Sequence, residues 1–126
     1  MKIEYRDGLL FTSIEIAYNG KNKKIDNIVI DTGASQSLIS QDYVDDIGIK
    51  VSSDDEIVTT YGVGGKEHAF VKTVDSVRVG EFFKTSCSLD FMSFDYEDIN
   101  GLLGLDILLD AGFIIDMKNL TMYLQK

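Results

Sequence analysis

The sequence lacks proline, has one cysteine and one histidine, and carries few basic residues for its acidic content. The single Cys87 excludes an internal disulfide, and a cysteine-ligated metal site would need further thiols. Lysine and arginine number 12 against 21 aspartates and glutamates, which gives a net charge of −9. Nucleic-acid-binding proteins carry a basic patch, so we predict no nucleic-acid partner, and the sequence indicates no metal site.

Long apolar runs are also absent. No run approaches the ~20 residues of a membrane-spanning helix, because Asp106, Asp110 and Asp116 interrupt the most hydrophobic stretch. The first 20 residues carry charges where a signal peptide would have its apolar region. We therefore expect a soluble, cytoplasmic protein without a membrane partner.

The length and composition are those of one globular domain. The chain has 126 residues, 44% of them apolar and 26% charged, and single domains cluster near ~100–150 residues. No proline-rich, low-complexity or charge-rich linker divides the sequence. We therefore predict a single domain over residues 1–126 with one core that needs neither metals nor disulfides.

Apolar residues recur mostly with a period of two. Residues 10–18 alternate as a half-buried strand does. Asn19-Gly20 comes next, a dipeptide that tolerates the positive φ angles of a hairpin turn. The return strand, 24–30, ends in a β-branched run that suits burial on both faces.

The rest of the chain is predicted as short strands and two short helices. Strands are expected at 56–61, 66–74, 77–79, 82–89, 113–116 and 120–124. One helix is capped by Ser40 and ends at Gly48, and the other spans 105–111 and ends at Gly112. The connection 90–100, with Asp90 at its start, is expected to be an acidic, solvated loop. Helices this small cannot cover both faces of a parallel sheet, so the pattern predicts an all-β barrel or sandwich.

The strongest chemical signal is the tripeptide Asp31-Thr32-Gly33, placed directly after a buried strand. An ionised carboxylate at the end of an apolar strand is costly unless it is hydrogen-bonded or paired. The position of Asp31 therefore indicates either a compensating interaction or a functional role for its carboxylate.

Residues 27–35, NIVIDTGAS, resemble the catalytic loop of the retropepsin-like aspartic proteases. The segment 101–106, GLLGLD, resembles the second signature of that family, and the glycine-rich turn at 62–65 falls where the family has its flap. The three elements keep the family order over residues 24–124. The resemblance implies a closed, single-lobe, all-β barrel with a glycine-tipped flap hairpin and one or two short helices.

The resemblance also assigns roles within the first signature. Asp31 is the catalytic aspartate. The Thr32 hydroxyl ties the two loops of the active site together, and the N–H of Gly33 donates to the aspartate in a turn that a Cβ would obstruct. Ala34 is small enough for the second loop to approach.

Two further sets of residues receive roles from the same resemblance. Leu102, Leu103 and Gly104 are expected to be core that supports the catalytic loop without touching substrate. The flap residues expected to cover the substrate are Tyr61, Gly62, Val63, Gly64 and Gly65. The turn at 62–65 also admits a second interpretation, a surface turn without a role. Tyr61 is interpreted equally well as a substrate contact or as strand core.

The chain supplies only one such aspartate, because Asp110-Ala111-Gly112 lacks the threonine and is interpreted as a helix end. Peptide hydrolysis by water needs a base and an acid, and two aspartates that share one proton supply both. The sequence therefore predicts a homodimeric aspartic endopeptidase that acts on extended peptides or proteins without a cofactor. The alternative is a catalytically silent retropepsin-like module for dimerisation or peptide binding.

Other chemistries fit less well. A nucleophilic triad would depend on His68 alone, and no Gly-x-Ser-x-Gly elbow is present. The turn at 62–65 lacks the further glycine of a dinucleotide-binding loop, which would stand at Glu67. A calcium loop beginning at Tyr96 would have the wrong first residue and would end at Ile107 instead of glutamate. A small-molecule-binding or metal-binding β-barrel stays a third hypothesis.

Overall fold

The computed structural model describes residues 1–62, 65–93, 96 and 98–125, with residues 60–62 and 65 described by their backbone alone. In this part of the chain the elements are arranged in the order β1 (Glu4–Arg6), β2 (Leu9–Tyr18), β3 (Lys21–Ile30), β4 (Leu38–Ser40), η1 (Gln41–Tyr43), η2 (Asp45–Ile47), β5 (Ile57–Gly62), β6 (Gly65–Val79), β7 (Phe82–Met92), β8 (Gly101–Leu103), α1 (Leu105–Ala111), β9 (Phe113–Asp116) and β10 (Thr121–Leu124).

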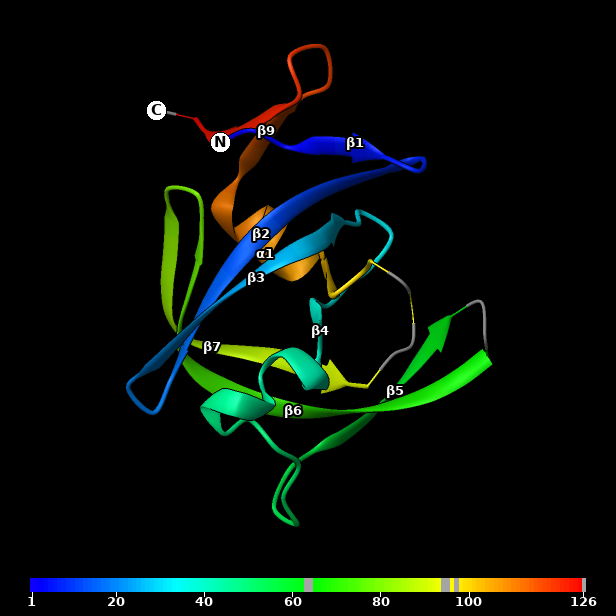
Figure 1. Ribbon diagram of the computed structural model, residues 1–126, viewed down its shortest axis with the longest axis vertical. Helices are drawn as coiled ribbons and strands as arrows, with labels where there is room; N and C mark the ends of the chain where they lie inside the picture. The colour runs from blue at the N-terminus through cyan, green and yellow to red at the C-terminus, as the bar shows by residue number, and fades with distance from the viewer. Residues whose placement is uncertain (63–64, 94–95, 97, 126) are drawn as a thin grey trace.

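The main sheet closes into a barrel (Figure 1). Its strands are ordered β1-β2-β3-β8-β4-β7-β6-β5, and a further pairing joins β2 to β6. The ring β2-β3-β8-β4-β7-β6 therefore has no free edge, while β1 and β5 extend the sheet beyond it. The predicted all-β, closed-barrel fold is confirmed.

The barrel encloses an aliphatic core. Alternate residues of β2 point inward, so that Ile14 and Ile16 are almost fully buried, as the period of two predicts. Facing them on β3, Ile25 and Ile28 are buried as well. Burial of this kind is the main free-energy term that holds a barrel of this size together.

β3 contains a β-bulge just before the segment that leads to Asp31. Thr12 pairs with Ile28 and Ile14 pairs with Ile25, so β3 has one residue more than β2 over this stretch. Asn27 takes up the extra residue with a φ of 60°, a value that asparagine tolerates better than most residues. Because a bulge bends its strand and changes the direction of the residues beyond it, this one sets the direction in which β3 ends.

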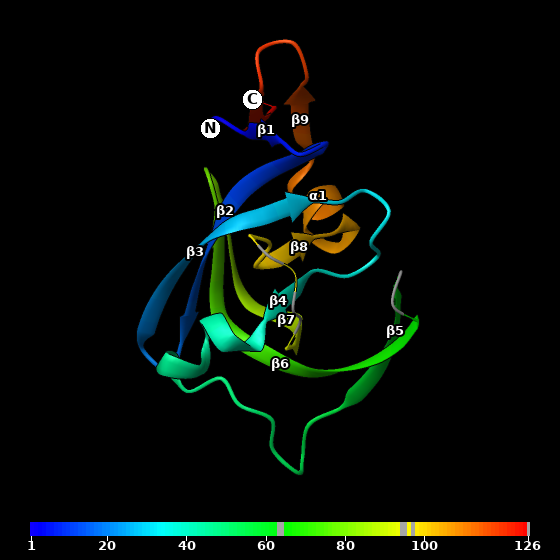
Figure 2. The ribbon, with the colours of Figure 1, turned by 45° about the vertical axis from the view of Figure 1, so that its right-hand side comes forward.

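The hairpin β5–β6 lies where the family resemblance places a flap hairpin. Its ladder runs from the pair Ile57–Phe70 to the pair Gly62–Gly65, and its turn residues 63–64 lie outside the described residues. β6 is one continuous, curved strand that pairs with β5, β7 and β2 (Figure 2). The predicted break between strands 66–74 and 77–79 is therefore wrong: β6 is one strand over Gly65–Val79, and its residues 76–78 pair with both β2 and β7.

The helices are partly as predicted. Leu105–Ala111 is helical, and Gly112 ends it in the left-handed region with a φ of 66°. After Ser40, however, two 3-10 helices replace the predicted single helix, and the Ser40 side chain makes no capping hydrogen bond. Gly48 ends the second of them at a φ of 91°, as expected of a terminating glycine.

Both ends of the described chain lie on the same side of the barrel (Figure 1). The Met1 amine donates to the Met122 carbonyl at 2.9 Å, and the Met122 N–H donates back to the Met1 carbonyl at 2.9 Å. The N-terminal segment thus adds to β10, which pairs with β9 in a separate small sheet. Among the described residues, none of the helices has the length and apolar character needed to cross a membrane.

Candidate active site

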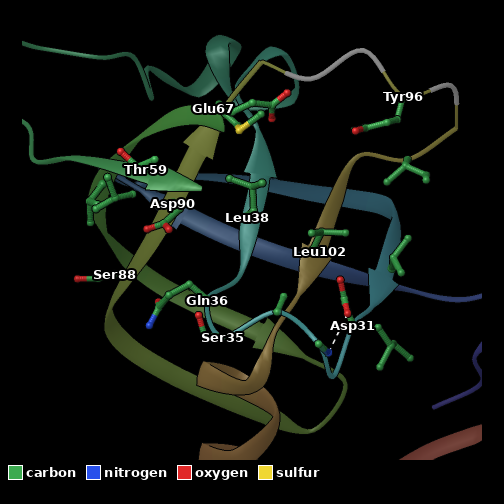
Figure 3. Close-up of a pocket in the computed structure, with 18 of the residues that line it drawn as sticks. Asp31, Ser35, Gln36, Leu38, Thr59, Glu67, Ser88, Asp90, Tyr96 and Leu102 are labelled. Atoms are coloured by element: carbon green, nitrogen blue, oxygen red, sulfur yellow. Dashed lines mark hydrogen bonds between the residues drawn. The ribbon is translucent and has the colours of Figure 1, made fainter. Parts of the chain in front are cut away.

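A cavity of about 1050 Å³ opens where β3 ends, between the segment 31–36 and the flap hairpin (Figure 3). Its floor and walls come from residues on β3, β4, β7 and β8, and the hairpin β5–β6 contributes the opposite side. The volume is that of a ligand site rather than of a packing defect. Asp31 lies at one end of this cavity.

Asp31 is fixed by its own loop and by the strand beside it. Its N–H donates to the Leu103 carbonyl at 2.9 Å, which continues the parallel pairing of β3 with β8. The Gly33 N–H donates to Oδ1 of Asp31 at 2.9 Å, and a Cβ on Gly33 would lie 3.2 Å from the same oxygen. The carboxylate thus accepts one backbone N–H and stays partly exposed to the cavity.

The second signature packs directly against the first. The Leu105 N–H donates to the Ala34 carbonyl at 2.8 Å. A Cβ on Gly104 would lie 2.8 Å from that carbonyl oxygen and 2.8 Å from the backbone carbon of Gln36. Real Cβ atoms do not approach backbone this closely, so only glycine permits the two segments to meet. The expected role of Gly104 thus corresponds to a contact in the structure.

A buried serine bridges the two segments. The Gly104 N–H donates to Oγ of Ser37 at 2.9 Å, and that hydroxyl donates to Oδ1 of Asp106 at 2.8 Å. Ser37 is 0% exposed. A hydrogen bond to a carboxylate is stronger than one between neutral groups, so Asp106 fixes the serine and the serine fixes the loop.

Comparison with known proteins agrees with this geometry. The family model "gag-polyprotein putative aspartyl protease" matches residues 14–110, which is more than half of the chain. The chain belongs to this aspartyl protease family. The family membership predicted from the two sequence signatures is therefore confirmed.

A solved structure shares the fold of this retropepsin-like chain. It is described as the crystal structure of a retropepsin-like aspartic protease from Rickettsia conorii, and it matches with a TM-score of 0.68 and 24% sequence identity. The match covers 96% of this chain and 86% of that one. No curated protein matches the sequence significantly.

The Thr32 side chain, next to Asp31 in the same loop, is exposed. Its hydroxyl makes no hydrogen bond to any other residue in the described ranges. The expected tie between two loops is therefore not made within one chain.

Leu102 and Leu103 point to opposite sides of β8. Leu103 is fully buried in the core, as predicted. Leu102 is only partly buried and lines the cavity, so its expected place in the core beneath the loop is wrong. Neighbouring side chains of a strand point to opposite faces, so Leu102 faces the cavity while Leu103 faces the core. The sequence pattern indicates the entry to a helix here, whereas the structure has the three-residue strand β8.

The flap residues are described only through their backbones. Tyr61 pairs with Lys66, and Gly62 pairs with Gly65 at the end of the ladder. Val63 and Gly64 lie outside the described residues. Whether Tyr61 touches substrate or packs in the strand stays an open prediction.

The solvated loop predicted at Asp90 is wrong. Asp90 belongs to β7, is 8% exposed and lines the cavity. Burial raises the pKa of its carboxyl above the ordinary value, and the charges of Asp106 and Glu56 raise the pKa further. The alternation of Leu89 and Phe91 beyond the predicted end of the strand is the sequence signal that indicates a longer strand.

The described residues contain no group of three or more histidine, cysteine, aspartate or glutamate side chains that could hold a metal ion. The expectation that the protein works without a metal or cofactor stays a prediction.

Proposed function

We propose that the protein is a homodimeric aspartic endopeptidase in which Asp31 of each protomer activates the hydrolytic water. The observation that carries this proposal is the fixed Asp31 carboxylate, which accepts the Gly33 N–H at 2.9 Å at one end of a large cavity. Its loop is locked to the second signature through the Leu105–Ala34 hydrogen bond. Family membership and fold support the same reaction class.

The chemistry requires a second carboxylate. Attack of water on a peptide carbonyl needs a base that takes the proton of water and an acid that protonates the leaving amine. Two carboxylates about 3 Å apart hold one proton between them, since both cannot be ionised, and the pair then serves as base and acid together. A symmetric second copy of Asp31 supplies the partner in a C2 dimer, the commonest oligomeric arrangement.

Thr32 supports a symmetric contact at this point. Its hydroxyl is exposed beside the catalytic aspartate and has no partner elsewhere in the described chain. In the proposed dimer it meets the other protomer's catalytic loop across the two-fold axis. The terminal segments pair within one chain, so the catalytic loops are the proposed centre of the interface.

The proposed substrate is an extended segment of peptide. The cavity lies between the flap hairpin and the floor formed by β4 and β8, and an extended chain bound there offers its backbone to strands as an added strand does. The hairpin must open for such a chain to enter and close to exclude water.

The test is cleavage of an unfolded protein and of a peptide library by the wild type and by Asp31→Asn. We expect specific activity to rise with protein concentration, because the site needs two protomers. Asp31→Asn should lose about 10³-fold or more in kcat/KM, within the range for loss of acid–base catalysis, while sedimentation gives the same dimer. Asp42→Asn, an exposed aspartate outside the cavity, is the matched control and should stay active.

A single-chain tandem of two copies tests the shared site directly. With both Asp31 residues present, its activity should no longer depend on concentration, and one Asp31→Asn copy should abolish activity. Full activity of the half-substituted tandem would rule out the paired aspartates. Peptide binding without cleavage by any dimer would favour the silent binding module.

A further inference from the structure

One charged residue interrupts an aliphatic row on the cavity wall. Cross-strand pairing places Val29, Leu102, Leu38, Asp90 and Val71 side by side across β3, β8, β4, β7 and β6. All five line the cavity, as neighbours on one face of a sheet do. An aliphatic residue at position 90 would continue this wall without a break. A carboxylate stands there instead.

The Asp90 carboxylate has no partner of its own in the part of the chain that the structure describes. No hydrogen bond or ion pair reaches its side chain, although the residue is only 8% exposed. Its backbone is satisfied, since its N–H donates to the Ser37 carbonyl at 3.2 Å. Figure 3 shows the side chain among the residues that line the cavity, beside Leu38. An unpartnered buried carboxylate is costly, so a group that enters the cavity can recover that free energy by pairing with it.

The surroundings of Asp90 are negative. The charged side chains among the described residues that line the cavity are all acidic: Asp31, Glu56, Glu67 and Asp90. Glu56, which directly precedes β5, lies two strand positions from Asp90: Val71 on β6 is the cross-strand neighbour of Asp90, and its N–H donates to the Glu56 carbonyl at 3.0 Å. Walls of one sign focus the field in a cleft and favour a ligand of opposite charge.

We infer that Asp90 is the acceptor for a lysine or arginine side chain of the bound peptide, so that the enzyme selects substrates with a cationic residue at one fixed position. The inference rests on the proposed function, since it names the substrate class of that cavity. The aliphatic neighbours Leu38 and Leu102 would pack on the methylene stem of such a side chain, while its charged end meets the carboxylate.

The position of Asp90 fixes where this residue falls in the substrate. β7 is three strands from β3 in the sheet, about 14 Å at ~4.8 Å per strand. Asp31 lies two residues beyond Val29, the β3 residue in the same row as Asp90, which adds about 7 Å along the strand direction at ~3.3 Å per residue. The two offsets combine to about 16 Å, so the selected cationic residue lies within about five residues of the scissile bond.

A neutral Asp90 would have a different preference. A protonated carboxyl could donate a hydrogen bond to a peptide carbonyl, and burial favours that form. It would then bind every peptide alike and would show no selection of side chains. The negative charges of Asp106 and Glu56, which act on Asp90, favour the cationic partner, because a bound ammonium or guanidinium is attracted to negative charge around it.

The first test is the cleavage profile of a peptide library with wild type, Asp90→Asn and the control Asp42→Asn. The wild type should require lysine or arginine at one position. Asp90→Asn should lower kcat/KM for such a peptide about 10- to 100-fold, the range for a hydrogen bond to a charged group, and change it less than about threefold for the glutamine analogue. Asp42→Asn should leave both values unchanged.

Cleavage without a cationic preference would overturn the inference and leave the proposed function intact. An equal loss for the lysine and glutamine peptides in Asp90→Asn would do the same, because it would point to a structural role.

A binding measurement separates the inference from catalysis. The probes are alanine-based decapeptides with one lysine or one norleucine at the same place, titrated against Asp31→Asn and against Asp31→Asn/Asp90→Asn. The lysine peptide should bind Asp31→Asn about tenfold or more tightly than the norleucine peptide, and the second substitution should remove the difference. Equal affinities would overturn the inference. Lysine-selective binding together with no cleavage by the wild type would instead refute the proposed endopeptidase.

Discussion

Asp31 and Asp90 line one cavity but are held in different ways. Asp31 accepts a hydrogen bond from a backbone N–H two residues away and stays partly exposed. Asp90 is buried in a strand, and no hydrogen bond or ion pair within the described chain reaches its carboxylate. The Asp31 carboxylate is held in place by a hydrogen bond, whereas no partner in the described chain offsets the free-energy cost of burying the Asp90 carboxylate.

This difference separates two uses of a carboxylate in a cavity. A catalytic group must be oriented, and backbone donors do this with little movement. A carboxylate that recognises a ligand gains more free energy on binding if it has no hydrogen-bond or ion-pair partner in the free protein. We therefore expect substitutions that disturb the Asp31 loop to lower the free energy of unfolding, and removal of the Asp90 charge to raise it.

The largest effect is expected from Gly104→Ala, which separates the segments that hold Asp31. Its Cβ would meet the Ala34 oxygen and the Gln36 carbon at 2.8 Å each, so the free energy of unfolding should fall by about 3 kcal/mol, the upper end for overpacking. Urea denaturation measures the change. Gly33→Ala is the control, because its Cβ meets only Oδ1 of Asp31, at 3.2 Å, and an equal loss there would contradict this account.

A smaller effect is expected from Ser37→Ala. The substitution leaves the buried Gly104 N–H and Oδ1 of Asp106 without their common partner, and an unsatisfied buried group costs about 1–3 kcal/mol. Thermal unfolding should show the loss, together with reduced cleavage if the loop carries the catalytic aspartate. Asp106→Asn keeps an oxygen acceptor for the serine and should lose less. A larger loss in Asp106→Asn would show that the charge, not the hydroxyl, holds the two segments.

The smallest effect has the opposite sign. Asp90→Asn removes a buried charge that has no partner in the described chain, so at pH 7 it should raise the free energy of unfolding by about 1 kcal/mol, or a few degrees in Tm. Asp31→Asn should change stability by less than about 0.5 kcal/mol, because an asparagine oxygen can accept the same Gly33 N–H. If Asp90→Asn is more stable and also loses the preference for cationic peptides, the wild-type carboxylate lowers stability but is needed for recognition.

The pH dependence sharpens this prediction. Burial raises the pKa of Asp90 in the folded protein above the ordinary value of 3.8. Between that value and the raised pKa the unfolded chain has released the proton and the folded chain still binds it, so the contribution of Asp90 to stability falls as the pH rises. The stability advantage of Asp90→Asn should therefore be near zero at about pH 4 and grow toward about pH 7. An advantage that does not vary with pH would contradict a charge-based cause.

The Asp31 loop was predicted from the resemblance of residues 27–35 to a family signature, and such a signature can be read from the sequence because the residues that form it are local. Asp31, Gly33 and the apolar strand before them lie within a few residues, and the predicted Gly33 donor is present. Ser37 and Asp106 were missed because their contact joins positions 69 residues apart, and no local pattern marks it. β4 and β8 were missed because a three-residue strand has no measurable period.

Asp90 was missed for a different reason. Its charge and the acidic residues after it favour a solvated loop, whereas the alternation of its neighbours favours a strand, and β7 continues through Met92. A charge that interrupts an otherwise regular alternation is a reason to expect a site, since the fold tolerates it only where it has a use.

The interlock of the two signatures also has a consequence during protein synthesis. The Asp31 N–H donates to the Leu103 carbonyl, and the Ala34 carbonyl accepts from the Leu105 N–H, so these two hydrogen bonds cannot form until residues 103–105 have been synthesised. Pairing of segments so far apart in sequence is slow, because the entropy of loop closure must be overcome first. A nascent chain that ends before residue 103 therefore lacks the partners that order the segment carrying Asp31.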